Sequence, residues 1–85
     1  MQTVEIYTMG YCGYCHAAKR LLTQKNVAFT EFSLDSNPAL RTEMMARAKG
    51  RHTVPQIFIG GVHVGGSDDL HALDRAGKLD RMLQG

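Results

Sequence analysis

The sequence predicts an α/β fold with the element order β-α-β-α-β-β-α, in which a mixed four-stranded sheet is flanked by three helices. Two observations predict it. The apolar residues change several times between the two-residue repeat of a strand and the three-to-four-residue repeat of a helix. Glycine, proline or asparagine stands at most of these changes. With 85 residues, the chain is expected to form one domain over residues 1–85.

The first half of the chain predicts a β-α-β unit. Val4–Tyr7 alternates β-branched and aromatic residues, as a strand does. After a turn at Thr8–Cys12, apolar side chains recur at helical spacing, and Asn26 is the expected end of this helix. Val27–Leu34 is the second predicted strand. Because the crossover in such a unit is right-handed and joins parallel strands, we expect these two strands to be parallel.

A second helix and a β-hairpin are predicted next. Asp35–Pro38 is a group of helix-starting residues, and Leu40–Ala48 carries the apolar positions of one helix face. Val54–Ile59 is a predicted strand that the chain enters through a proline. Gly60–Gly61 then turns the chain into Val62–Val64, which indicates an antiparallel hairpin.

The last predicted helix begins after a glycine-rich segment. Gly65–Asp69 leads to a helix N-terminus, where Ser67 or Asp68 is a natural N-cap. Gly77 is expected to end this helix, and a few apolar residues finish the chain. The complete order of elements is that of the thioredoxin architecture in its smallest form.

The composition excludes several classes of protein. An apolar content of 44% and a charged content of 21% are typical of a folded globular domain. The formal net charge is only +2 and the basic residues are dispersed, so no nucleic-acid partner is expected. The N-terminal residues lack a signal-peptide pattern and no apolar run reaches membrane-spanning length. We therefore expect a cytoplasmic protein with no membrane partner.

Cys12 and Cys15 are the two cysteines, and their spacing indicates reactivity. The loop that they would close is too short to stabilise a domain. In a reducing compartment, such a pair indicates redox or metal chemistry. Cys12 falls at the start of a predicted helix, where the dipole and free N–H groups favour a thiolate, so we predict that it is the nucleophile. Cys15 lies one turn later and deeper, and is the predicted resolving thiol.

A zinc site is one alternative for the two cysteines. Structural zinc needs four ligands, and the histidines would have to supply two of them. None of the four histidines has a partner at the usual ligand spacing; they are His16, His52, His63 and His71. Redox chemistry is therefore favoured, and it requires no metal.

Four segments together resemble the glutaredoxin family, and they are Val4–Thr8, Cys12–Cys15, Thr53–Ile59 and Gly65–Asp69. The likeness is to the short bacterial dithiol type and covers essentially the whole chain. It implies an enzyme, a glutathione-dependent thiol–disulfide oxidoreductase. Such an enzyme acts on glutathionylated proteins and on proteins with disulfides, with glutathione as the reductant.

The resemblance also implies where glutathione binds. The expected contacts are Tyr14, Thr53, Val54, Pro55, Gly66, Ser67 and Asp68. The Val54–Pro55 bond should be cis, and the Val54 backbone would pair with the cysteinyl part of glutathione like an added strand. The γ-glutamyl carboxylate would meet the N–H groups of Ser67 and Asp68, and its ammonium the Asp68 carboxylate. A plain N-cap is the alternative role of Asp68.

Three positions depart from the family's common pattern. Met9 stands where lysine is frequent, so another cation, Arg51 or Arg47, would have to meet the glycyl carboxylate of glutathione. Ser67 stands where some relatives carry a third cysteine. Gly13 stands where proline is common after the nucleophile, and it leaves a backbone N–H that proline lacks.

Gly13 raises the alternative function. Some relatives with glycine at this position bind a [2Fe–2S] cluster between two subunits, through one cysteine of each and two glutathione thiolates. By this resemblance Cys12 is a possible cluster ligand, and the expected monomer would become a cluster-bridged homodimer. A further rival is a reductase-linked hydrogen donor that does not use glutathione, against which the Gly66–Asp68 turn argues.

Overall fold

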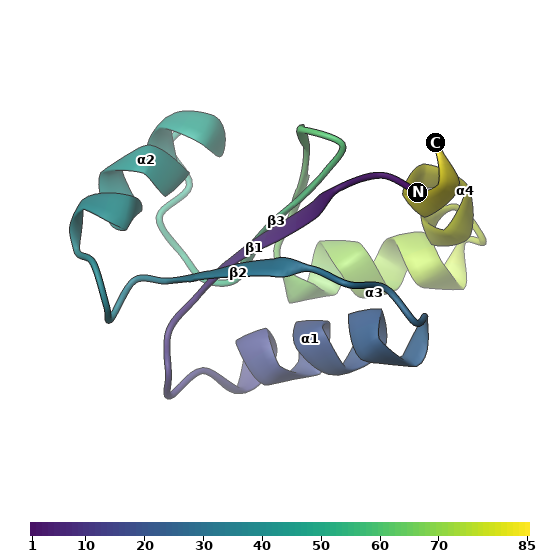
Figure 1. The fold of residues 1–85 in the computed structure, drawn as a ribbon, viewed down its shortest axis with the longest axis horizontal. Coiled ribbons are helices and arrows are strands. Elements are labelled where there is room, and N and C mark those ends of the chain that lie inside the picture. Colours follow the sequence, from purple (N-terminus) through teal and green to yellow (C-terminus); the bar gives the residue numbers. More distant parts are fainter.

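The computed structural model describes all of residues 1–85 and contains one mixed sheet with helices on both faces (Figure 1). The strands are β1 (Val4–Thr8), β2 (Thr30–Ser33), β3 (Gln56–Ile59) and β4 (Val62–Gly65). Their order in the sheet is β2-β1-β3-β4, with β1 and β2 parallel and the other neighbours antiparallel. The predicted fold class, the parallel first pair and the hairpin are confirmed.

The helices are α1 (Gly13–Gln24), α2 (Ala39–Arg47), α3 (Ser67–Arg75) and α4 (Leu79–Gln84). The sequence predicted three helices, so α4 is an addition. Gly77, with φ of +72°, ends α3 as expected, and Leu79 and Leu83 then bury themselves at helical spacing. None of the four helices has both the length and the apolar character that crossing a bilayer requires.

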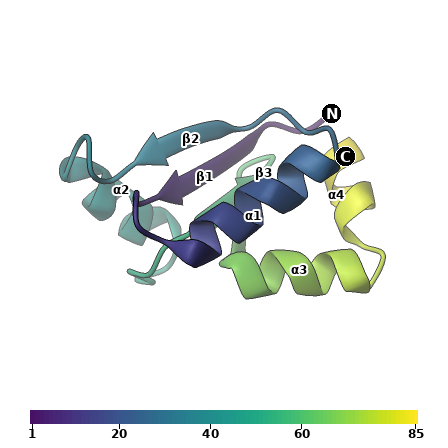
Figure 2. The ribbon, with the colours of Figure 1, turned by 90° about the horizontal axis from the view of Figure 1, so that it is seen from below.

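The pleat of the central strands divides the core into two clusters. Ile6 and Ile57 pack in one cluster with residues of α1, α3 and α4, whereas Tyr7 and Phe58 pack in the other with α2. All four side chains are at most 1% exposed. Figure 2 shows α1 and α3 in front of the strands and α2 behind them. Both layers therefore rest on β1 and β3, and the carboxyl end of β1 leads directly to α1.

Two strands are shorter than predicted. β2 pairs with β1 only from Thr30, although the buried Val27 already packs in the core. β3 begins at Gln56, so the segment before it is not part of the sheet. Asn26, the predicted end of the first helix, has a left-handed φ of +58° just after α1.

Candidate active site

Cys12 occupies the N-cap of α1, with an extended backbone. The backbone N–H of Cys15 donates to the Cys12 sulfur over 3.2 Å, and the Cys12 thiol donates to the Val54 carbonyl over 3.7 Å. Cys12 is partly exposed. A partly exposed sulfur that receives an N–H group of the first helical turn is well placed to attack a disulfide.

Cys15 lies behind Cys12 and is only 1% exposed. Burial raises the pKa of the Cys15 thiol to about 12; its hydrogen bond with Cys12 adds to this effect, whereas the Met9 backbone opposes it. Cys15 therefore stays a protonated thiol at neutral pH. The two sulfurs therefore differ in access, since Cys12 is partly exposed and Cys15 is buried, as a nucleophile and a resolving thiol must.

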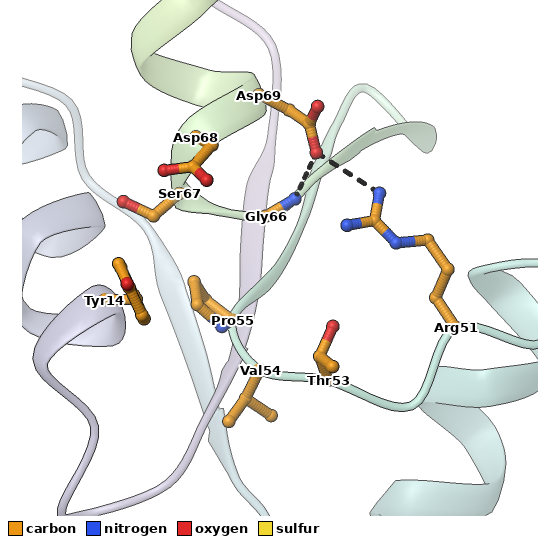
Figure 3. Close-up of a pocket in the computed structure, with 9 residues that line it drawn as sticks. All are labelled: Tyr14, Arg51, Thr53, Val54, Pro55, Gly66, Ser67, Asp68 and Asp69. Carbon is orange, nitrogen blue, oxygen red and sulfur yellow. Dashed lines mark hydrogen bonds and ion pairs between the residues drawn. The ribbon is translucent and has the colours of Figure 1, made fainter.

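A pocket of about 390 Å³ is lined in part by Val54, the residue whose carbonyl accepts from the Cys12 thiol. Figure 3 shows the residues that line this pocket. Its walls come from the start of α1, the segment before β3 and the start of α3. Nine residues line it: Tyr14, Arg51, Thr53, Val54, Pro55, Gly66, Ser67, Asp68 and Asp69. The structure thus brings together all seven residues that the sequence analysis expected at glutathione. It also places there Arg51, one of the two cations suggested for the glycyl carboxylate, and Asp69, which was not expected.

Val54 presents an unpaired stretch of backbone to this pocket. No backbone hydrogen bond in the structure uses its N–H or its carbonyl, and its only recorded partner is the Cys12 thiol. The Val54–Pro55 bond is cis, as the resemblance implied. An N–H and a C=O that no other backbone group uses are what an extended ligand needs for strand-like pairing.

The N-terminus of α3 differs from the prediction. The N-cap is Gly66, and neither Ser67 nor Asp68 caps the helix. The Asp69 carboxylate instead accepts the Gly66 N–H over 2.9 Å and an Arg51 N–H over 3.2 Å. The Gly66 N–H, followed by Arg51, holds the pKa of Asp69 below its usual range. A carboxylate three residues after the N-cap commonly accepts the N-cap N–H. The sequence analysis did not assign this role to Asp69.

This assignment leaves the Asp68 carboxylate free for a ligand. It makes no ion pair or hydrogen bond in the structure and lines the pocket (Figure 3). The N–H groups of Ser67 and Asp68 also have no backbone partner, as expected in a first helical turn. The helix start therefore offers two donors and a carboxylate side by side.

The cation that lies beside Met9 is Arg41 and not Arg47. Arg47 does not line the pocket: it pairs with Glu5 over 2.9 Å and lies 4.1 Å from the centre of the Phe58 ring. Arg41, which the sequence analysis missed, places a guanidinium nitrogen 3.3 Å from the Met9 sulfur and donates to the His52 carbonyl over 2.8 Å. Only the folding of α2 against the β1–α1 turn brings this charge there.

The comparisons with known proteins agree on one family. The profile of the glutaredoxin family matches residues 4–64. A glutaredoxin from Pseudomonas aeruginosa is 58% identical over 83 residues, covering 98% of both chains. Glutaredoxin 3 of Escherichia coli K12 is 56% identical over 84 residues, covering 99% of this chain and 100% of its own. The crystal structure of a buckwheat glutaredoxin–glutathione complex is 34% identical with a TM-score of 0.90, covering 98% of this chain and 77% of that one.

Proposed function

The chain belongs to the glutaredoxin family of thiol–disulfide oxidoreductases, and we propose that it uses glutathione, with Cys12 as nucleophile and Cys15 as resolving thiol. One observation carries the proposal. The sulfur that caps α1 touches Val54 at the edge of a pocket lined by every residue expected to bind glutathione. The glutathione complex of the similar buckwheat protein supports the same ligand here.

The first proposed reaction removes glutathione from proteins and needs only Cys12. The Cys12 thiolate attacks the glutathione sulfur of a mixed disulfide, the substrate S–S bond breaks, and the protein thiolate leaves and takes up a proton. Cys12 then carries glutathione. The thiolate of a second glutathione attacks the sulfur of the bound glutathione, and the S–S bond to Cys12 breaks. This releases oxidised glutathione and restores the Cys12 thiolate.

The second proposed reaction reduces protein disulfides and needs both cysteines. Cys12 attacks the substrate disulfide and stays bound to one of its sulfurs. Cys15 then attacks the Cys12 sulfur, which frees the substrate thiol and forms the Cys12–Cys15 disulfide that two glutathione molecules reduce. Because the hydrogen bond with Cys12 helps to raise the pKa of Cys15, forming the mixed disulfide removes part of the barrier to ionising Cys15.

Glutathione would lie across the pocket from α3 towards Met9. Its cysteinyl backbone pairs with Val54, its γ-glutamyl carboxylate meets the N–H groups of Ser67 and Asp68, and its ammonium meets the Asp68 carboxylate. We assign the glycyl carboxylate to Arg51, which lines the pocket and whose side chain is 47% exposed beside Asp69, with Arg41 next to Met9 as the second cation.

The Asp68→Asn variant tests this binding mode. Loss of the partner for the ammonium is expected to raise KM for a glutathione mixed disulfide about tenfold, with kcat nearly unchanged. Folding should be unaffected, because it is the Asp69 carboxylate, and not that of Asp68, that accepts the N–H of the N-cap Gly66. Asp80→Asn, a substitution of an aspartate that pairs with Lys25 away from the pocket, is the matched control. An unchanged KM in Asp68→Asn would show that Asp68 does not bind the ammonium.

We further propose that residues 1–85 act as one glutaredoxin domain, in monomeric form, in the cytoplasm. Both core clusters rest on β1 and β3, which supports a single folding unit. The partners would be glutathione together with glutathionylated and disulfide-containing proteins. A reducing compartment rich in glutathione is where such a dithiol is kept in its active form.

A second candidate function is the binding of a [2Fe–2S] cluster between two copies of this chain. Cys12 is partly exposed, and a Cβ on Gly13 would meet no atom within 4 Å, so the surface beside the sulfur is open. Cys15 is buried, and no group of three or more histidine, cysteine, aspartate or glutamate side chains comes together in one chain. One Cys12 from each copy and two glutathione thiolates would supply the four sulfurs such a cluster needs.

Anaerobic reconstitution with iron, sulfide and glutathione tests the cluster proposal. We expect a coloured dimer with visible absorbance, and a lower yield for Gly13→Pro. Proline is tolerated at the first position of a helix, so this variant should keep the fold. A colourless monomer from the unmodified chain would contradict the proposal.

A further inference from the structure

Gln56 is a fully buried polar side chain to which the reactions above give no role. It is the first residue of β3 and is 0% exposed. Its side-chain nitrogen donates to the Thr53 carbonyl over 3.0 Å and lies 3.3 Å from the Thr53 hydroxyl. A buried amide is retained only where its hydrogen bonds are satisfied, so these contacts identify what Gln56 holds in place.

His63 completes the hydrogen bonding of this amide. From β4, its Nε2 lies 2.6 Å from Gln56 Oε1, and its ring packs against Phe58 with centroids 5.0 Å apart. A backbone carbonyl can only accept, so the Gln56 nitrogen must face Thr53 and the Gln56 oxygen must face His63. His63 Nε2 therefore carries the hydrogen. This assignment gives a chain of hydrogen bonds from His63 through Gln56 to Thr53.

These bonds are the only ones that fix Thr53. No backbone hydrogen bond in the structure uses the N–H or carbonyl of Thr53, and the segment around it lies outside the helices and strands. The next residue, Val54, is the one whose backbone is free to pair with a ligand. The placement of Val54 thus depends on how firmly its neighbour is held.

We propose that Gln56 and His63 are positioning residues that hold Thr53, and through it the unpaired Val54 backbone, where glutathione binds. The inference rests on the proposed function, because it names the support of that same binding site. Neither side chain lines the pocket at Cys12 or touches its sulfur. Their effect therefore falls on the binding of glutathione and not on the attack by Cys12.

The charges around His63 are consistent with a neutral ring. Burial lowers the pKa of His63, Arg51 and Lys49 lower it further, and Asp69 opposes them. A neutral imidazole carries one ring hydrogen, and the Gln56 contact requires it on Nε2.

Two substitutions of His63 separate positioning from simple packing. His63→Phe keeps a flat ring against Phe58 but removes the donor, whereas His63→Gln keeps a donor. We expect KM for a glutathione mixed disulfide to rise about five- to tenfold in His63→Phe, with kcat and the rate of Cys12 alkylation by iodoacetamide within about twofold of wild type. His63→Gln should restore KM to within about twofold. Val62→Thr, on the same strand at an exposed position, is the control.

An unchanged KM in His63→Phe, or a His63→Gln variant as impaired as His63→Phe, would overturn the proposal. The ring-nitrogen chemical shifts of His63, read by NMR in the free protein, test it without glutathione. We expect the Nε2–H form in wild type and a loss of that preference in Gln56→Met. An Nδ1–H ring refutes the positioning role by itself. An Nε2–H ring in a wild type that does not saturate with glutathione substrates refutes the proposed function, and the positioning role with it.

Discussion

Cys12→Ser is expected to abolish turnover with every disulfide substrate, whereas Cys15→Ser is expected to keep the removal of glutathione and lose the reduction of protein disulfides. A serine hydroxyl at the N-cap of α1 is not ionised at neutral pH, so the first attack fails. The loss should reach at least about 10³-fold, as it does when an enzyme loses its nucleophile. Cys15 enters only when a mixed disulfide with a protein must be resolved.

Steady-state rates with two substrates measure this difference. One substrate is a glutathione mixed disulfide and the other a protein disulfide, each with glutathione as reductant. In Cys15→Ser the first rate should stay within about threefold of wild type, since the buried Cys15 is not ionised in the resting enzyme. Appreciable activity of Cys12→Ser on either substrate would overturn the assignment of the nucleophile.

Gly65→Ala is expected to lower stability and to impair glutathione binding together. Gly65 ends β4 with φ of +119°, a conformation that alanine adopts only at a cost. A Cβ there would overlap the Asp69 carboxylate and lie 2.8 Å from an Arg51 nitrogen. The carboxylate would have to leave the Gly66 N–H, and the start of α3 would lose its cap. We expect the free energy of unfolding to fall by about 2–4 kcal/mol, and KM for glutathione substrates to rise.

Gly77→Ala is the matched control for this prediction. Gly77 also has a positive φ, of +72°, but a Cβ there would meet nothing within 4 Å. The Gly77→Ala variant should show only the cost of placing alanine at a positive φ. We expect its free energy of unfolding, measured with urea, to fall by about 1 kcal/mol, with unchanged kinetics on glutathione substrates. Equal losses of stability in the two variants, or a normal KM in Gly65→Ala, would contradict the role given to Asp69.

The fold was predictable because its signals are local. The alternation in β1, the two glycines between β3 and β4, and Asn26 after α1 each act within a few residues of where they stand. The bounds of β2 and the separate helix α4 were not predictable in this way. Strand pairing depends on which residues of β1 lie opposite, and α4 depends on the core that receives Leu79 and Leu83.

The sequence predicted the segments that line the site but not the side-chain contacts that hold these segments in place. The pocket residues come from three short segments of the chain, so the motifs of these segments and the family resemblance identify most of them together. Three contacts that support the site depend on the direction that a side chain takes. They are those of Asp69 with Gly66, of Arg41 with Met9 and of Gln56 with His63. The approach of Arg41 to Met9 arises only when segments 32 residues apart meet. The contact of Gln56 with His63 depends on how β3 and β4 pair in the hairpin, which the residue pattern alone does not specify.

The most direct measurement of the central claim is the intact mass of the two cysteine variants after exposure of the folded protein to oxidised glutathione. We predict that Cys15→Ser gains one glutathione, on Cys12. Cys12→Ser should gain none while it is folded, because its remaining thiol is buried and protonated, and should gain one after unfolding. A folded Cys12→Ser variant that takes up glutathione as readily as Cys15→Ser would contradict the account.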